Sequence, residues 1–266
     1  MKGRVLIAAG SDSGGGAGIQ ADIKAVTALN GFAMTAITAL TAQNTLGVEG
    51  IHEIPAAFVR RQIEVVAADL GADAAKTGML ATAEVIETVA ESFARFLPGV
   101  PVVVDPVMVA KGGAHLLEDS AAETLRRVLV PMAFVLTPNL FEAEVLTGRT
   151  IEGEADMLAA ARDLLAMGAK AVLLKGGHLP GDALTDLLLT PEGPIRFTNA
   201  RIPTPHTHGT GCTTASAIAC GLAQGMGLKD AVARALAYVH RAIATAPGFG
   251  HGHGPLNHAH TVREGV

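Results

Sequence analysis

Short apolar runs alternate with longer amphipathic segments along almost the whole chain of 266 residues. The run at residues 5–9 precedes a helical pattern over residues 19–29, and the run at residues 102–104 precedes another over residues 121–129. Continuous apolar runs are typical of strands that are buried on both faces, as in parallel sheets covered by helices. The alternation therefore predicts an α/β fold, a three-layer α/β/α sandwich around a central, mostly parallel sheet.

The same pattern supplies the remaining elements of the expected fold. Further strands are expected at residues 34–40, 72–76, 133–136 and 171–174, with a hairpin at residues 184–189 and 195–197. Further helices are expected at residues 58–70, 84–96, 157–167 and 228–245, and one after Gly211. No linker rich in proline, serine or charge interrupts this series, so we expect residues 1–266 to form a single domain.

The charge balance argues against nucleic acid and anionic membranes as partners. The net charge is −5 and no run of lysine or arginine occurs, whereas such partners are bound by basic patches. The apolar run at residues 5–9 is too short for the core of a signal peptide. No apolar run approaches the ~20 residues that cross a bilayer. We therefore expect a cytoplasmic protein.

The two cysteines are not expected to form a disulfide bond. Cys212 and Cys220 are the only cysteines, and both fall within the helix expected after Gly211. A rise of ~1.5 Å per residue would separate them by roughly 12 Å, which is beyond the reach of a disulfide. Their spacing therefore agrees with a reducing compartment, and Cys220 is interpreted as a core residue.

A glycine-rich segment, residues 10–18, directly follows the first predicted strand. Ligands of parallel α/β sheets bind outside the carboxyl ends of the strands, and glycines let backbone N–H groups approach a ligand closely. The segment contains neither a G-x-G-x-x-G dinucleotide fingerprint nor the Gly-Lys-Ser/Thr end of a Walker A loop. It is either a ligand-binding loop or a flexible connection between a strand and a helix.

A second glycine turn, residues 208–214, leads into a helix of small residues. Free N–H groups and the positive end of the helix dipole favour a phosphate or an oxyanion at such a position. Gly209, Thr210 and Gly211 are therefore predicted to form an anion hole. The same environment lowers the pKa of a thiol below its usual ~8.5, which suits Cys212 as a catalytic base or nucleophile. The alternative is a small buried cysteine beside an ordinary turn.

Oxygen-bearing side chains follow two neighbouring predicted strands. Asp105 ends the strand at residues 102–104, and Asn139 and Glu142 follow the strand at residues 133–136. Carboxylate and amide oxygens suit Mg²⁺, so these three residues are candidate metal ligands. Asn139 with Glu142 three residues later also fits a helix capping box, and the two roles are compatible.

Two further polar side chains are candidates for ligand contacts. Lys175 leaves a buried strand into two glycines and could reach a phosphate, or else be an ordinary solvated lysine at a strand end. Gln43, in the segment Thr41–Asn44, carries an amide whose donors and acceptor match the edge of an aminopyrimidine, in the way that glutamine pairs with adenine. The alternative for Gln43 is a surface loop residue.

Taken together, these segments resemble the hydroxymethylpyrimidine/phosphomethylpyrimidine kinases of thiamin biosynthesis. The resemblance rests on residues 9–24, 37–45, 76–80, 105–108, 137–139, 175–178, 208–212 and 250–258. The motifs occur in order over nearly the whole chain, and several together are specific where each alone is weak.

The resemblance implies a ribokinase-like fold and a two-step activity. The γ-phosphoryl group of MgATP would be transferred to the hydroxymethyl oxygen of 4-amino-5-hydroxymethyl-2-methylpyrimidine, and the monophosphate would then be converted to the diphosphate. ATP and Mg²⁺ are the implied cofactors, and a homodimer is the implied assembly.

The resemblance also assigns roles to individual residues. Cys212 matches the catalytic position of the family, Lys175 would offset the triphosphate charge with Mg²⁺, and Gln43 would bind the pyrimidine edge. Aromatic residues make up only 3% of the chain and tryptophan is absent, so the ring is expected to be held by aliphatic side chains and peptide planes. The residues that would shape its pocket are Gly10, Asp22, Thr41, Met79 and Val107.

Three other functions are considered. A pyridoxal or pyridoxine kinase on the same fold is the nearest, because its substrates also carry a hydroxymethyl group. A nucleotide-dependent oxidoreductase is disfavoured by the missing dinucleotide fingerprint. A metal-binding module would use histidines of the carboxy-terminal tail at residues 251–260, but the tail lacks cysteine or acidic partners, and a glycine-rich lid or loop is the preferred interpretation.

Overall fold

The computed structural model describes residues 1–108, 119–177 and 183–262, and His178 of the quoted motifs lies outside these ranges. Within them, nine strands form one sheet in the order β3-β2-β1-β4-β5-β6-β7-β8-β9. The strands are β1 (Arg4–Asp12), β2 (Phe32–Gln43), β3 (Val48–Glu53), β4 (Ala74–Thr77), β5 (Val102–Val104), β6 (Val135–Leu136), β7 (Val172–Leu174), β8 (Ala183–Thr190) and β9 (Gly193–Ala200).

Parallel pairing runs through the centre of the sheet, as predicted. The strands β2, β1, β4, β5, β6 and β7 pair in parallel, whereas β3, β8 and β9 pair antiparallel at the two ends. The carboxyl ends of the six parallel strands therefore lie along one edge of the sheet, and the residues that follow them meet there.

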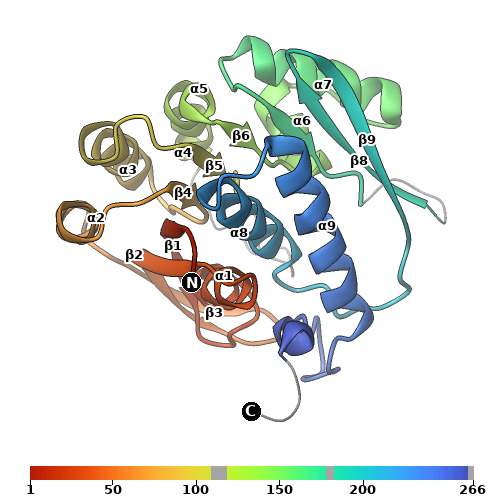
Figure 1. The fold of residues 1–266 in the computed structure, drawn as a ribbon, viewed down its shortest axis with the longest axis horizontal. Helices are drawn as coiled ribbons and strands as arrows, with labels where there is room; N and C mark the ends of the chain where they lie inside the picture. The colour runs from red at the N-terminus through yellow and green to blue at the C-terminus, as the bar shows by residue number, and fades with distance from the viewer. Residues whose placement is uncertain (109–118, 178–182, 263–266) are drawn as a thin grey trace.

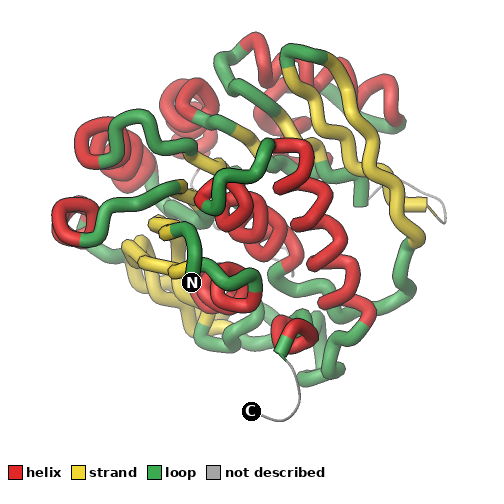
Figure 2. The backbone as a smooth tube through the Cα atoms, in the orientation of Figure 1, coloured by secondary structure: helices red, strands yellow, loops and turns green. Residues whose placement is uncertain are grey.

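Helices cover both faces of the sheet (Figures 1 and 2). The strand β1 shows the cause: Leu6 and Ala8 belong to one apolar core and Val5, Ile7 and Ala9 to the other, as the two-residue period of a strand requires. One face carries α1 (Gly18–Ala28), α8 (Thr210–Ala223) and α9 (Leu228–Ala244). The other carries α2 (Ala56–Asp69), α3 (Ala83–Phe96), α4 (Asp119–Thr124), α6 (Leu140–Thr147) and α7 (Glu154–Ala166).

Most predicted strands and helices are confirmed, but three local features differ. The edge strand β3 is not predicted, because most of its residues are exposed and it carries no apolar run. The helix α6 is anticipated only through its cap. The helix expected over residues 121–129 is broken: α4 gives way to a π-helical turn (Leu125–Leu129) and then to α5 (Val130–Met132), which contains Pro131. No helix in the described ranges combines the length and apolarity that a membrane span requires.

Candidate active site

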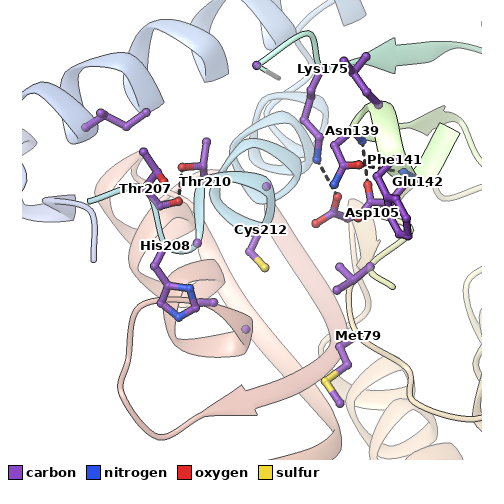
Figure 3. Close-up of a pocket in the computed structure, with 18 of the residues that line it drawn as sticks. Met79, Asp105, Asn139, Phe141, Glu142, Lys175, Thr207, His208, Thr210 and Cys212 are labelled. Carbon is purple, nitrogen blue, oxygen red and sulfur yellow. Dashed lines mark hydrogen bonds and ion pairs between the residues drawn. The ribbon is translucent and has the colours of Figure 1, made fainter. Parts of the chain in front are cut away.

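A cavity of about 1200 Å³ opens at the edge where the parallel strands end. Strand ends and the start of α8 supply its walls (Figure 3). Its lining includes all but one of the candidate residues: Gly10, Thr41, Gln43, Met79, Asp105, Val107, Asn139, Glu142, Lys175, Gly209, Thr210, Gly211 and Cys212. Asp22 is the exception, since its side chain is fully buried and is not part of the lining.

The glycine-rich loop after β1 wraps around its own aspartate. The N–H group of Gly14 donates to Asp12 Oδ1 at 2.8 Å, and those of Gly16 and Ala17 donate to Oδ2 at 3.0 and 2.8 Å. Three backbone donors are thus directed at a side chain of the protein. These three N–H groups are therefore engaged by the carboxylate of Asp12, whereas Gly10, Ser11, Ala17 and Gly18 of the same segment line the cavity.

The turn before α8 lies in close contact with the glycine-rich loop after β1. Gly209 precedes the helix with φ of 84°, and a Cβ at this position would lie 1.8 Å from the carbonyl oxygen of Gly16, so only glycine fits. The N–H group of Thr213 donates to the Gly209 carbonyl at 2.9 Å. Of the N–H groups that precede it, that of Thr210 makes a long hydrogen bond of 3.4 Å to the carbonyl oxygen of Thr207. Those of Gly211 and Cys212 have no acceptor within the helix and lie at the cavity end of α8.

Gly211 brings this helix start against a lysine and an aspartate. A Cβ at position 211 would lie 3.2 Å from Lys175 Nζ and 3.6 Å from Asp105 Oδ2. Lys175 Nζ donates to Asp105 Oδ1 at 3.2 Å, and the hydroxyl of Thr137 donates to the same oxygen at 3.2 Å. A positive helix end, an ammonium group and a carboxylate therefore surround one volume.

Asn139 and Glu142 form the capping box that their spacing predicts. The Glu142 N–H group donates to Asn139 Oδ1 at 2.9 Å, and the Asn139 N–H group donates to Glu142 Oε2 at 2.8 Å. Burial raises the pKa of Glu142; Lys175 opposes this rise and Asp105 adds to it. The carboxyl groups of residues 105 and 142 are thus near enough to repel each other.

The thiol of Cys212 does not have the low pKa that its helix position predicts. Cys212 lies in the first turn of α8, between His208 and Asp105 in the view of Figure 3. Burial raises the pKa of the thiol to about 12; Lys76 opposes the rise, whereas Asp22 and Asp105 add to it. Desolvation outweighs the helix end here, so the thiol is protonated at neutral pH in the ligand-free protein.

Lys76 and Asp22 form a buried ion pair under Cys212. Both side chains have 0% exposure, and Lys76 Nζ lies 3.0 and 2.9 Å from the two carboxylate oxygens of Asp22. The hydroxyl of Ser216 on α8 donates to Asp22 Oδ1 at 2.7 Å. Asp22 does not line the cavity, which corrects its predicted place in the pocket wall. It contacts Lys76, which does line the cavity, and its charge adds to the raised pKa of Cys212. From the sequence Lys76 has no assigned role, although a lysine at the end of a buried strand is a recognisable signal of a site residue.

A second cluster of buried polar side chains, around His208, lies across the cavity from Asp105 (Figure 3). His208 is 8% exposed, and its Nε2 atom is 3.0 Å from Asp12 Oδ2 and 3.2 Å from the terminal amide of Gln43. The sequence gave His208 no role, because Asp12 and His208 are 196 residues apart. The structure makes Gln43 part of a polar cluster at the cavity wall.

The carboxy-terminal tail packs over the turn after β2. The His253 N–H group donates to the carbonyl oxygen of Thr45 at 2.8 Å, and a Cβ at Gly252 would lie 2.1 Å from that oxygen. No group of three or more histidine, cysteine or acidic side chains within the described residues has the geometry of a metal site.

Comparison with known proteins places this chain in a family. The model of the phosphomethylpyrimidine kinase family matches residues 12–257. The hydroxymethylpyrimidine/phosphomethylpyrimidine kinase of Bacillus subtilis is 50% identical over 96% of this chain and 94% of its own length. The thiamine biosynthesis bifunctional protein ThiED of Geobacter sulfurreducens is 52% identical over 97% of this chain, which spans about half (52%) of that relative.

Solved structures agree with this placement. A phosphomethylpyrimidine kinase from Clostridium difficile is 40% identical, with a TM-score of 0.80 over 91% of this chain and all of that one. An ADP complex of Bacillus subtilis pyridoxal kinase is 37% identical, with a TM-score of 0.90 over 97% and 98% of the two chains. The three-layer fold is therefore ribokinase-like, and the chain belongs to the phosphomethylpyrimidine kinase family.

Proposed function

We propose that this protein is an ATP-dependent kinase that phosphorylates 4-amino-5-hydroxymethyl-2-methylpyrimidine and then converts the monophosphate to the diphosphate. Relatives named for these two reactions support the proposal at about 50% identity over almost the whole chain. The observation that carries it is the convergence of the α8 N-terminus and Lys175 beside Cys212, since Gly211 lies against the lysine.

The transferring phosphoryl group is assigned to this convergence. Phosphoryl transfer depends mainly on in-line placement and on neutralising charge that spreads over the phosphate oxygens. The N–H groups of Gly209, Thr210 and Gly211 form the anion hole of the proposed mechanism. Lys175 Nζ, already held by Asp105 at 3.2 Å, supplies a full positive charge on the opposite side.

The heteroaromatic ring is assigned to the other end of the cavity. Gln43 offers hydrogen bonds to the edge of the ring, and Met79 and Val107 pack together in a small apolar cluster with Ala39. Gly10 lies beside them, since a Cβ there would meet Met79 Sδ at 3.1 Å. Thr41 completes the wall beside Gln43. This arrangement provides apolar contacts for the ring and polar contacts for its edge.

Cys212 is assigned as the base that accepts the proton of the hydroxymethyl group. Because the pKa of the free thiol is about 12, this role requires the pKa to fall when charged ligands bind. Lys76 already acts in that direction, and the charge of Asp105 acts against it. Neutralisation of Asp105 by a bound cation would remove one cause of the high pKa.

The residues at the Asp105 side of the cavity fit a Mg²⁺ ion. Asp105 Oδ1 and Glu142 Oε2 are engaged by protein donors, which leaves one further carboxylate oxygen on each side chain. Burial raises the pKa of Glu142, and the charge of Asp105 adds to the rise. Two neighbouring carboxyl groups favour a bound cation, and oxygen ligands suit Mg²⁺. Mg²⁺ would supply charge neutralisation for the phosphates, with Asp105 and Glu142 as its holders and Asn139 supporting Glu142 through the cap.

Product analysis tests the proposed function. Incubation of the protein with MgATP and the hydroxymethylpyrimidine is expected to give first the monophosphate and then the diphosphate, followed by ³¹P NMR or anion-exchange chromatography. Chelation of Mg²⁺ is expected to abolish both products. Formation of ADP without either pyrimidine product would contradict the assignment.

A pyridoxal kinase is the second candidate, because structures of pyridoxal kinase from Staphylococcus aureus match this chain with TM-scores of 0.91. The same assay with pyridoxal separates the two. We expect kcat/KM for the pyrimidine to exceed that for pyridoxal by at least about tenfold, since a site that hydrogen-bonds a substrate edge rejects rings that lack it. The opposite ratio would favour the pyridoxal assignment.

A cytoplasmic homodimer remains our expectation for the assembly. Light scattering coupled to size-exclusion chromatography tests the homodimer directly. A mass near twice the 27.1 kDa of one chain is the expected result, and a mass of one chain would contradict it.

A further inference from the structure

Three polar side chains from distant parts of the chain meet at the ring end of the cavity. Asp12 ends β1, Gln43 ends β2, and His208 lies in the turn that leads into α8. The imidazole packs tightly against the glycine loop, since a Cβ at Gly16 would lie 2.4 Å from His208 Cδ2. The ring of His208 therefore has little freedom to rotate, and its contacts are fixed by the fold.

The contact with Asp12 determines where His208 carries a proton. Burial acts to raise the pKa of Asp12, but hydrogen bonds from His208 and from backbone N–H groups outweigh it, so the pKa lies below its usual value. Asp12 is therefore a carboxylate and can only accept hydrogen bonds. His208 Nε2, at 3.0 Å from Asp12 Oδ2, must carry the hydrogen and donate it.

This assignment decides which atom of the Gln43 amide can face His208. In the structure the amide nitrogen Nε2 lies 3.2 Å from His208 Nε2, which sets two N–H donors against each other. The oxygen and nitrogen of an amide are assigned from their hydrogen-bond partners and not from their positions alone. The atom that faces His208 must accept, so we assign it as Oε1.

Thr41 requires the same orientation for an independent reason. Its hydroxyl donates to the carbonyl oxygen of Ser11 at 2.9 Å and also lies 3.1 Å from the other terminal atom of Gln43. A hydroxyl has a single hydrogen. If that hydrogen goes to Ser11, the facing atom of Gln43 must donate and is Nε2. The two neighbours of the amide therefore favour the same orientation. The single hydrogen on His208 Nε2 is shared between Asp12 Oδ2 at 3.0 Å and the facing oxygen of Gln43 at 3.2 Å, as a three-centre hydrogen bond.

The rotated amide presents a defined pattern to the cavity. One hydrogen of Nε2 is used by Thr41 and one lone pair of Oε1 by His208, so one donor and one acceptor remain. Ser13 fixes the backbone of the same residue, accepting from its N–H group and donating to its carbonyl, both at 2.9 Å. A donor beside an acceptor complements the amino group and adjacent ring nitrogen of an aminopyrimidine.

We propose that His208, held by Asp12, is a positioning residue that fixes the orientation of the Gln43 amide and thereby sets the preference for an aminopyrimidine ring. The inference rests on the proposed function, because it concerns which ring that site accepts. His208 acts through Gln43 and not by contact with the reacting atoms.

A double-mutant cycle tests this coupling. His208→Phe removes the donor but keeps a planar ring, and is expected to raise KM for the pyrimidine by about 10- to 100-fold, the loss that follows when an amide is no longer held for a paired edge. The KM for ATP should stay unchanged and kcat should fall far less than kcat/KM. In a Gln43→Ala background, His208→Phe should have almost no further effect on KM.

A substrate comparison and a conservative variant separate positioning from a structural role. His208→Phe should lower the ratio of kcat/KM for the pyrimidine over that for pyridoxal, whereas general damage would lower both equally. His208→Gln, which can still donate a hydrogen bond to Asp12, should recover part of the loss. Melting temperatures of the variants report on folding separately.

Several results would overturn the proposal. Additive effects of Gln43→Ala and His208→Phe on KM would show that His208 does not act through the amide. An ¹⁵N NMR spectrum of the histidines that finds His208 protonated at Nδ1 alone would contradict the assigned donor. A wild-type protein that forms no pyrimidine phosphate would defeat the proposed function itself, which is a distinct outcome from additivity in an active enzyme.

Discussion

Replacement of Cys212 by alanine is expected to lower kcat for phosphorylation of the hydroxymethyl group by about 10²–10⁴-fold, the usual contribution of a general base. Alanine retains the backbone N–H group at position 212, so the start of α8 and its anion hole stay intact. The KM values for ATP and for the pyrimidine should therefore change little. Steady-state kinetics with both substrates varied give the three constants.

The second phosphorylation supplies an internal comparison for the same variant. Its acceptor is a phosphate monoester, whose second pKa is about 6, so the attacking oxygen is already deprotonated at neutral pH. Cys212→Ala should slow this step by less than about tenfold, because no base is needed there. The matched control is Cys220→Ala, which changes a thiol with 0% exposure in the core and should leave both rates nearly unchanged.

The outcomes of this comparison have different meanings. Equal losses in the two steps would show that the sulfur positions the acceptor and does not take its proton. An unchanged kcat in both steps would remove Cys212 from the mechanism.

Replacement of Lys76 by methionine is expected to lower the free energy of unfolding by about 3–5 kcal/mol, the cost of breaking a buried ion pair at one partner. Methionine is similar in length, but it leaves the carboxylate of Asp22 buried with only the hydroxyl of Ser216 as a side-chain partner. Urea denaturation followed by circular dichroism measures the change.

Two further variants test the cause of this loss. Arg60→Met breaks the exposed pair with Glu91 and should cost at most about 1 kcal/mol, because exposed ion pairs contribute little. The double variant Lys76→Met with Asp22→Asn should recover part of the loss, since no charge is then buried unpaired. A loss from Lys76→Met no larger than that from Arg60→Met would contradict the account.

The sequence predicts the fold well where apolar runs are continuous. The run at residues 5–9 becomes the centre of β1, where none of the side chains exceeds 1% exposure, so burial on both faces leaves a readable pattern. The edge strand β3 leaves no such pattern, because it has a partner on one side and most of its side chains are exposed. The π-helical turn at Leu125–Leu129 depends on local packing that periodicity does not encode.

The residues of the candidate site could likewise be predicted only in part from the sequence. Asp105, Asn139 and Lys175 could be found because each lies within three residues of the end of a buried strand, and strand ends meet at one edge of a parallel sheet. His208 and Lys76 could not be assigned, since their partners Asp12 and Asp22 lie 196 and 54 residues away. The pKa of Cys212 was mispredicted because the helix start is visible in the sequence and the desolvation of the thiol at the cavity wall is not.

The geometry around Cys212 is the central claim, and a crystal structure with a non-hydrolysable ATP analogue and the hydroxymethylpyrimidine measures it directly. We expect the terminal phosphate of the nucleotide at the N–H groups of Gly209–Cys212, and the hydroxymethyl oxygen within about 3.5 Å of Cys212 Sγ, the reach of a proton transfer. Nucleotide bound elsewhere, or a sulfur out of reach of the alcohol, would contradict the proposed mechanism.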